Sequence, residues 1–148
     1  MKTRIPAVQG WVQIDPAQPR LLGTRCTACG TVFFPRESVR CRNPHCGSRS
    51  LEETALSPRG KLCSYTNAGY QPPPPYVSRT NPFVPFVIAA VELDAEKMVV
   101  LGQVVDGVDP ETLKVGMDME LTLDTLLEDE TSETITWKWK PVGFGERA

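Results

Sequence analysis

The chain has 148 residues, of which 41% are hydrophobic and 23% are charged, as expected for one ordinary soluble domain or two small ones. No apolar run approaches the ~20 residues that are needed to span a bilayer. The segment 1–6 also lacks the apolar centre of a signal peptide. We therefore expect a cytoplasmic protein, in which cysteines persist as thiols or metal ligands and not as disulfides.

The net charge of −2 conceals two halves of opposite sign. Residues 1–61 contain ten Lys or Arg and four Asp or Glu, a net charge of +6, whereas residues 62–148 contain six and fourteen, a net charge of −8. A basic front and an acidic back indicate two modules, and an anionic ligand would be met by the first.

The first twenty residues contain three prolines and one tryptophan, Trp11. We expect a poorly structured arm in which Trp11 packs against the body of the protein. The alternative is an arm that docks on a partner chain.

Four cysteines form two pairs, each followed directly by glycine. Two residues separate Cys26 from Cys29, and four separate Cys41 from Cys46. Four thiolates that converge from two short turns are the ligand set of a tetrahedral zinc site, and they leave no position open for water or substrate. We predict a structural Zn²⁺ site, because a module of this size cannot bury enough apolar surface to fold without one. Iron in a rubredoxin-like site is the alternative.

Short β-prone runs surround the cysteines, at residues 21–25, 31–35 and 51–56. They predict a zinc ribbon over residues 21–57, in which either Phe33 or Phe34 covers the metal. The fifth cysteine, Cys63, belongs to no recognisable motif, and we expect it to be a half-buried, inert thiol.

The remainder of the chain predicts a small barrel. Five β-prone segments are separated by turn signals, and Asp109 followed by Pro110 predicts one short helical turn. Five strands without a long helix are typical of an OB-fold, which we place at residues 58–141, before a tail at 142–148. The fold class is therefore mainly β. The predicted strands are 61–67, 86–93, 98–105, 117–124 and 134–140.

Two of these strands alternate clearly between apolar and polar residues. Met119 and Leu121 mark the core face of one strand, and Trp137 and Trp139 mark the core face of the last, with Lys138 predicted on the solvent side. Gly102, inside a strand, predicts a bulge or a tight bend.

A loop of proline and aromatic residues occupies positions 68–85, including four consecutive prolines at 72–75. Polyproline is extended and cannot join a central strand. Because so long a loop in a small domain is usually functional or disordered, we interpret it as a docking surface.

Several short segments, in this order and spacing, resemble the rubredoxin-like zinc-ribbon/OB-fold proteins that accompany acyl-CoA enzymes. The resemblance covers about residues 20–141. The spacing from Cys41 to Cys46 departs from the family pattern, in which two intervening residues are commoner, so His45 remains an alternative to Cys46 as the fourth ligand. The matching segments are Leu-Gly-Thr-Arg-Cys-Thr-Ala-Cys-Gly at 22–30, Phe-Phe-Pro at 33–35, Arg-Gly-Lys-Leu at 59–62, Ser-Tyr-Thr at 64–66, Val-Glu-Leu at 91–93, Lys-Val-Gly-Met at 114–117 and Trp-Lys-Pro at 139–141.

The resemblance implies a non-catalytic accessory subunit that helps to form or cover the coenzyme A site of a larger thiolase-like enzyme, for example one that cleaves benzoylsuccinyl-CoA. The resemblance leaves two alternatives. The partner could be an aldolase or a MaoC-like hydratase, or the chain could be a standalone acyl-CoA binder. A CoA ligand would need cations for its phosphates and apolar surface for its arm. The candidate CoA- or partner-binding residues are Arg42, Arg49, Tyr70, Tyr76, Arg79 and Phe83.

The sequence also favours a role without catalysis by this chain alone. It contains a single histidine and no phosphate loop, dinucleotide turn or zinc-protease motif. Single-stranded nucleic-acid binding is the main rival function, since OB-folds serve there. The net charge of −8 on the barrel half would repel a phosphate backbone.

Overall fold

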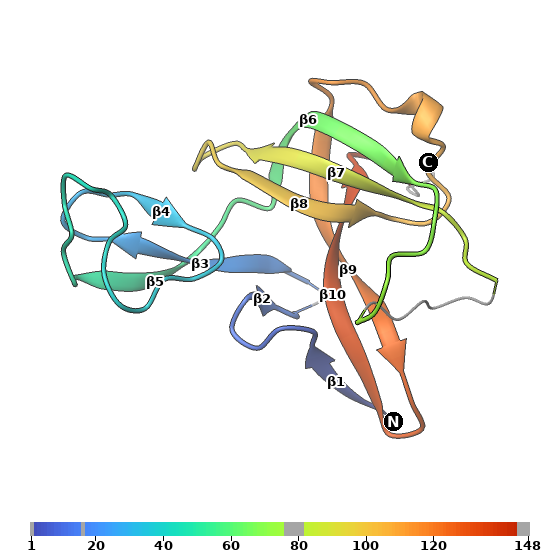
Figure 1. The fold of residues 1–148 in the computed structure, drawn as a ribbon, viewed down its shortest axis with the longest axis horizontal. Helices are drawn as coiled ribbons and strands as arrows, with labels where there is room; N and C mark the ends of the chain where they lie inside the picture. The colour runs from blue at the N-terminus through green and yellow to red at the C-terminus, as the bar shows by residue number, and fades with distance from the viewer. Residues whose placement is uncertain (1, 16, 76–81, 145–148) are drawn as a thin grey trace.

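A zinc-ribbon-like module occupies the N-terminal part of the computed structural model, which describes residues 2–15, 17–75 and 82–144 (Figure 1). Its central strand, β3 (Arg20–Cys26), pairs antiparallel with β4 (Val32–Phe33) on one side and with β5 (Leu51–Ala55) on the other. The three strands follow the predicted runs closely. They form a narrow module that projects from the barrel (Figure 1).

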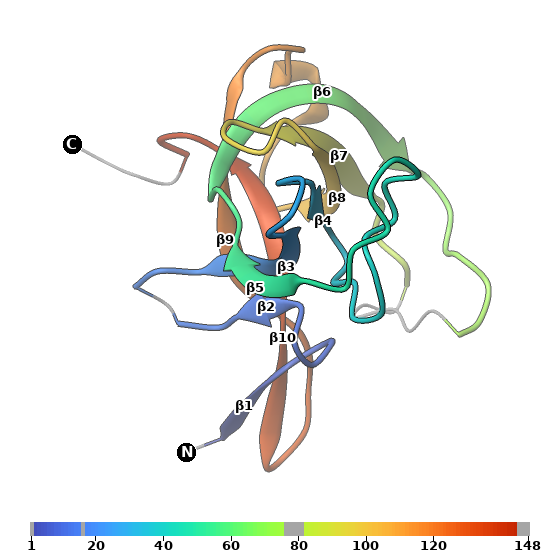
Figure 2. The same cartoon turned by 90° about the vertical axis from the view of Figure 1, so that its left-hand side faces the viewer.

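The barrel consists of five strands, as predicted. β6 (Arg59–Ala68), β7 (Phe86–Leu93) and β8 (Val99–Val104) form an antiparallel meander, and β9 (Asp118–Glu128) and β10 (Ser132–Pro141) form a long hairpin. Pairing of β6 with β9, and parallel pairing of β8 with β10, closes the sheet on itself. Figure 2 shows the strands curving around a common centre.

The one helical turn of the described residues also matches the prediction. The 3₁₀ helix η1 (Pro110–Thr112) begins after Asp109, whose side chain accepts a hydrogen bond from the backbone N–H of Glu111. Its three residues are too few to cross a membrane, and no other described segment forms a helix that could.

Alternating residues of all five barrel strands fill the core, as the sequence pattern predicts. Met119, Leu121 and Trp139 lie in it, on the faces expected of them. Gly102 pairs regularly with Ala89, so of the two predicted alternatives the bulge is wrong, while the tight bend stays a prediction. A Cβ atom at Gly102 would lie 2.8 Å from Trp137 Nε1 and 2.8 Å from Trp139 Cδ1, so close packing of two indoles requires the glycine.

A β-bulge does occur elsewhere, at Cys63. The register of β6 against β7 shifts between Leu62 and Ser64, which leaves Cys63 as the extra residue of the bulge. The side chain of Cys63 is exposed, so the prediction of a half-buried thiol is wrong. The local shift in register, which the alternation of the sequence does not reveal, is the reason.

The N-terminal arm differs most from the prediction, because it is ordered by strand pairing. β1 (Thr3–Pro6) pairs in parallel with the first part of β10, beyond the barrel, and β2 (Val12–Gln13) pairs with β3. The prediction of a poorly structured arm is wrong, whereas the prediction that Trp11 packs against the body is confirmed by its contacts with Phe34 and Trp137. Short strands with prolines carry little sequence signal, and both of these strands exist because distant edges are available to them.

Lys138 also departs from the predicted pattern. It lies on the face of β10 opposite Trp139, as expected, but its side chain is only 2% exposed. Its ammonium group lies 2.7 Å from the carboxylate of Asp124 and 3.9 Å from that of Asp106. A buried cation needs such partners, since its desolvation would otherwise be very costly.

Candidate metal centre

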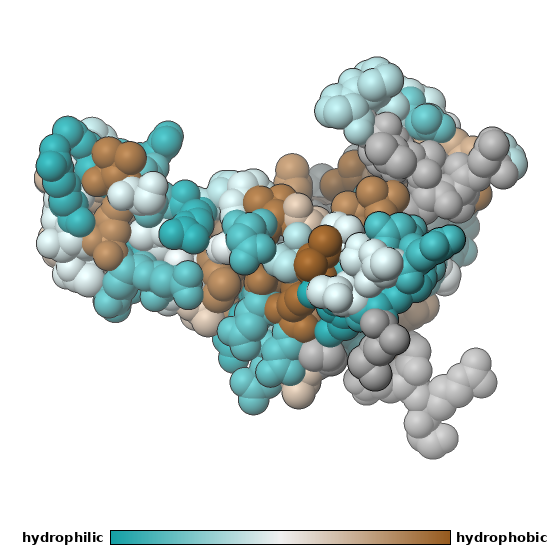
Figure 3. Space-filling model, turned by 90° about the horizontal axis from the view of Figure 1, so that it is seen from below, coloured by the Kyte–Doolittle hydropathy of each residue, from teal (hydrophilic) through white to brown (hydrophobic). Residues whose placement is uncertain are grey.

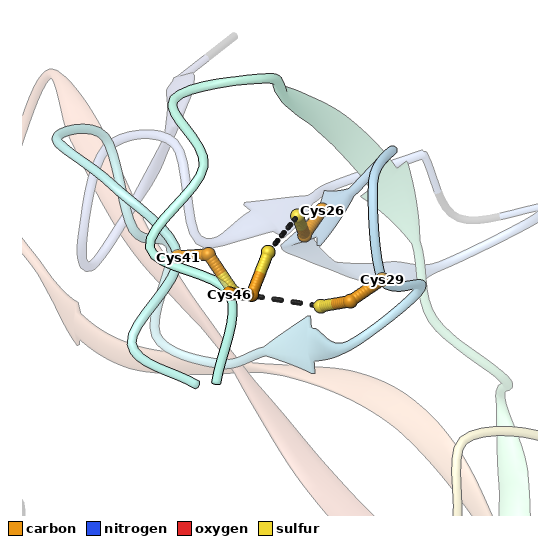
Figure 4. Close-up of side chains that lie close together, drawn as sticks. All are labelled: Cys26, Cys29, Cys41 and Cys46. Carbon is orange, nitrogen blue, oxygen red and sulfur yellow. Dashed lines mark hydrogen bonds between the residues drawn. The ribbon is translucent and has the colours of Figure 1, made fainter. Parts of the chain in front are cut away.

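The four paired cysteines converge between two loops of the ribbon (Figure 4). Their Sγ atoms all lie within 4.8 Å of one another, with 3.8 Å between Cys26 and Cys46 and 3.5 Å between Cys29 and Cys41. A tetrahedral zinc with bonds of ~2.3 Å places its sulfur ligands about 3.8 Å apart. The arrangement therefore fits a four-thiolate zinc site.

Backbone hydrogen bonds shape the first cysteine turn. Cys26 is the last residue of β3, and its carbonyl accepts a 2.8 Å hydrogen bond from the N–H of Gly30. Gly30 has a φ of 81°, a left-handed conformation that glycine adopts without strain. The turn therefore directs Cys26 and Cys29 toward the same point.

The second turn is built around Asn43. Its carbonyl accepts hydrogen bonds from the N–H groups of Cys46 and Gly47, at 3.0 and 3.2 Å. Its side-chain oxygen accepts from the N–H of His45, at 3.0 Å. These bonds close the wider turn that four intervening residues require.

His45 and Cys46 were alternative fourth ligands, and the structure distinguishes their positions. Cys46 contributes its Sγ atom to the cluster, whereas His45 is exposed and does not belong to it. We therefore propose Cys26, Cys29, Cys41 and Cys46 as the metal ligands.

The two sides of the cluster have different acidities in the metal-free site. Hydrogen bonds from the Thr31 hydroxyl, at 3.1 Å, and from the Thr31 backbone lower the pKa of the Cys29 thiol to about 6. Burial raises the pKa of the Cys41 thiol to about 12. Near neutral pH, Cys29 is therefore a thiolate, whereas Cys41 must lose a proton when a metal binds.

We predict that zinc affinity falls as the pH falls. Above pH about 6, protons compete with the metal for Cys41 and Cys46, whose thiol pKa values are both raised. Below pH about 6 they compete for Cys29 as well, so the decline becomes steeper. Competition with a chromophoric chelator between pH about 5 and 9 measures this.

Thr31→Val is the matched variant for this measurement, because it removes the hydroxyl that stabilises the Cys29 thiolate. The steeper part of the curve should then begin at a higher pH. A zinc affinity that does not change with pH in the wild-type chain would contradict the prediction.

An aromatic cluster joins the ribbon to the barrel. Trp11 lies with its ring centroid 5.5 Å from that of Phe34 and 6.3 Å from that of Trp137, and the rings of Phe34 and Trp137 are 5.8 Å apart. Of the two phenylalanines predicted near the metal, Phe34 thus packs at this junction. The arm, the ribbon and the barrel each contribute one ring, so the junction could not be identified from any one segment.

The predicted CoA- or partner-binding residues that the structure describes do not lie together. Arg42 and Arg49 lie in the ribbon loops, whereas the segment 69–75, which contains Tyr70, lies at the other end of the molecule (Figure 1). Tyr70 is 78% exposed, and Phe83 packs its ring 5.9 Å from that of Phe86. Tyr76 and Arg79 lie outside the described residues.

The two ribbon arginines differ in their surroundings. Arg42 forms an ion pair with Glu37 but keeps most of its side chain in solvent. Arg49 lines a cavity of about 250 Å³ together with Arg36, Glu37 and Glu52. Seen from below, the ribbon surface is mostly hydrophilic, while apolar residues gather over the middle of the molecule (Figure 3).

The fold and the cysteine cluster define a zinc-ribbon/OB-fold protein. Residues 15–52 match the family model described as the rubredoxin-like zinc ribbon domain of ChsH2, and residues 53–124 match the ChsH2 C-terminal OB-fold domain. The chain belongs to this ChsH2 family of proteins, also known as DUF35. The family boundary at 52/53 lies within β5, whose pairing with β3 extends to Ala55.

Relatives and a solved structure support the same assignment. The chain is 35% identical over 126 residues to a DUF35 domain-containing scaffold protein of Methanocaldococcus jannaschii, covering 82% of each chain. It is 30% identical over 129 residues to the benzoylsuccinyl-CoA thiolase subunit BbsA of Geobacter metallireducens, covering 86% of this chain and 79% of BbsA. The structure called Ltp2-ChsH2(DUF35) aldolase matches with a TM-score of 0.58 and 30% identity, covering 83% and 85% of the two chains.

Proposed function

We propose that the chain is a non-catalytic accessory subunit of a cytoplasmic acyl-CoA enzyme complex, in which it helps to form or cover the CoA site. A thiolase-fold enzyme is the preferred partner. The observation that carries this proposal is the similarity, over 86% of the chain, to a protein named as a thiolase subunit. The relative from Methanocaldococcus jannaschii is named as a scaffold protein, and the solved structure is named as an aldolase with ChsH2. Both names support the same class of role.

The described residues suit a structural role for the metal. The family's zinc ribbon and the four clustered cysteines suggest a structural metal ion. A site closed by four sulfurs has no ligand position for substrate. We propose that the ion is zinc and that it holds the ribbon, residues 21–57, in a fixed shape beside an OB barrel of residues 58–141.

The ribbon is the part of the chain suited to meet the anionic phosphates of CoA. Its loops contain Arg36, Arg40, Arg42 and Arg49, and the side chain of Arg42 remains accessible beside Glu37. Arginine binds phosphate through charge-assisted, bidentate hydrogen bonds. We therefore place the contribution of this chain to CoA binding on the ribbon loops, with Arg42 and Arg49 as the first candidates.

We predict that the tagged full-length chain, purified from its native cell, carries a larger acyl-CoA enzyme in a fixed stoichiometry. The partner is identified by mass spectrometry, and the ratio is measured by size-exclusion chromatography with light scattering. Recovery of an aldolase or a hydratase would select one of the alternative partners. Repeated recovery of a lone monomer would contradict the proposal.

Activity measurements should assign the chemistry to the partner. We expect the isolated chain to have no acyl-CoA cleaving activity and the reconstituted complex to exceed the partner alone. A labelled single-stranded oligonucleotide at low salt is the control for the rival function. Tight, salt-dependent binding of that oligonucleotide would favour nucleic-acid recognition instead.

A further inference from the structure

The first half of β8 has a neighbouring strand on one side only. β8 pairs with β7 from Val99 to Gln103, but it meets β10 only where Gln103 and Val104 lie beside Lys138 and Trp139. Figure 1 shows β8 reaching β10 only at its C-terminal end. We call the unpaired side of Val99–Leu101 the β8 edge.

The ladder with β7 shows which backbone groups point toward the β8 edge. The N–H of Leu93 donates to the carbonyl of Met98 at 2.9 Å, so the carbonyl of Met98 faces β7. Bonded pairs alternate along an antiparallel ladder, which assigns the backbone groups of Val100 and Gly102 to β7. The N–H and C=O groups of Val99 and Leu101 therefore face the open side.

Two hydrogen bonds on the other side agree with this assignment. The N–H of Val105 donates to the carbonyl of Trp139 at 3.0 Å. Val105 is separated from Val99 and Leu101 by an even number of positions, so its backbone groups should point to the same side of β8 as theirs, and they do. The indole N–H of Trp137 donates to the carbonyl of Leu101 at 3.1 Å. Within the described part of the chain, the N–H groups of Val99 and Leu101 and the carbonyl of Val99 have no hydrogen-bond partner on that side.

The side chains of the β8 edge are apolar and exposed. Val99 is 52% exposed and Leu101 is 62% exposed. Ala90 lies opposite Leu101 on β7, and Glu92 lies opposite Val99. These side chains lie on β7 and β8, the second and third strands of the barrel. OB-folds commonly bind their ligands through the face of these two strands. Its apolar character, with a carboxylate at one end, suits a peptide and not a phosphate backbone.

Natural proteins usually protect an open edge with proline, lysine or a bulge. Positions 99–102 contain no proline or charged residue, and the pairing with β7 is regular there. Three backbone groups remain open, the N–H and carbonyl of Val99 and the N–H of Leu101, because Trp137 holds the Leu101 carbonyl. Such groups along one strand edge are complementary to an extended strand.

We propose that the β8 edge docks an extended segment of the larger enzyme subunit, which adds to the barrel sheet beside Val99–Leu101. This inference rests on the proposed function and names the surface that holds the partner. Alternate residues of the segment are apolar and cover Val99 and Leu101, and a basic residue lies near Glu92. The segment's backbone pairs with the N–H and carbonyl of Val99 and with the N–H of Leu101, whereas the Leu101 carbonyl keeps its hydrogen bond from Trp137.

Two variants of Leu101 test the docking site. Leu101→Pro removes an N–H that the fold does not use, and proline is tolerated on an edge strand. Leu101→Asp places a charge among the apolar contacts. The matched control is Val115→Asp, because Val115 is 70% exposed and lies in the turn after η1, outside the β8 edge. Melting temperature and zinc content establish that each variant is folded.

The readout is the dissociation constant of each full-length variant for the purified partner subunit, measured by biolayer interferometry. We expect Leu101→Pro and Leu101→Asp each to weaken binding by about tenfold or more, since each removes net favourable contacts. Val115→Asp should bind as the wild type does. Hydrogen exchange should show the Leu101 amide exchanging rapidly in the free chain and slowly in the complex.

The outcomes separate this inference from the proposed function. If the wild type binds the partner but both Leu101 variants bind equally well, or the Leu101 amide remains unprotected in the complex, the docking site is wrong and the proposed function stands. If the wild-type chain has no acyl-CoA enzyme partner, both fail.

Discussion

Replacing Cys26 by Ser is expected to abolish zinc binding and to unfold the ribbon. The Cys26 side chain is fully buried and its Sγ atom lies 3.8 Å from that of Cys46, so the site loses a central ligand. Structural zinc supplies about 10–16 kcal/mol of apparent binding free energy in zinc-finger peptides, and so small a module has little core to replace it.

Metal analysis measures the first effect and hydrogen exchange the second. The wild type should contain about one zinc per chain, and the variant almost none. The backbone N–H of Thr27, which donates to the carbonyl of Ser50 across the two loops at 2.8 Å, should lose its protection in the variant. Iron in the wild-type protein would select the rubredoxin-like alternative.

Cys63→Ser is the matched control for Cys26→Ser. Cys63 is exposed at the β-bulge, outside the cluster, so this variant should keep its zinc and its melting temperature. A Cys26→Ser protein that remains folded in the ribbon and retains full metal content would contradict the structural role of the cluster.

The cysteine cluster was predictable because its information is local. Each pair lies within one short turn, and the glycine after each pair identifies that turn. The alternation that predicts the barrel core is local in the same way, and Met119 and Leu121 follow it. One residue of the site required the structure. Choosing between His45 and Cys46 depends on how the wider turn folds over Asn43.

Apart from the local β-bulge at Cys63, the features that the sequence did not predict depend on contacts between distant segments. β1 pairs with β10 across more than a hundred residues, and Trp11, which was expected to pack against the body, has Trp137 as a partner that no local pattern identifies. Lys138 is buried because Asp124 and Asp106 lie beside it, although a lysine in an alternating strand normally indicates a solvent face. The β8 edge is likewise defined by where β10 stops pairing, which no local pattern encodes.

The structure also shows where the acidic charge of the second half of the chain is paired with cations. Several carboxylates of the barrel are paired with cations, including Glu120, which lies 3.3 Å from Arg59 and 3.2 Å from Lys140. The net charge of −8 already counts Lys140, but Arg59 and Lys61, which belong to the basic half, pair with Glu120 and Asp118 and offset part of it there. The β8 edge is apolar within this acidic half, and so a partner segment with apolar residues and a basic flank would suit it.

Replacing Trp139 by Ala is expected to cost about 3–5 kcal/mol of the free energy of unfolding, the range for removal of a large core aromatic residue. Trp139 is fully buried, and β10 pairs at this residue with both β8 and β9. Its ring also packs against the bare backbone of Gly102. The variant would leave a cavity where the barrel closes. Urea unfolding of the zinc-loaded protein measures the change.

Trp139→Phe is the control that separates ring volume from hydrogen bonding. Within the described chain, the buried indole Nε1 of Trp139 has no hydrogen-bond partner, so replacing it removes no hydrogen bond. We therefore expect Trp139→Phe to cost only about 1–2 kcal/mol, for the lost volume. If Phe destabilises the protein as much as Ala does, the indole N–H contributes a bond and our description of the core is wrong. If Ala costs less than about 1 kcal/mol, the barrel is not closed around Trp139.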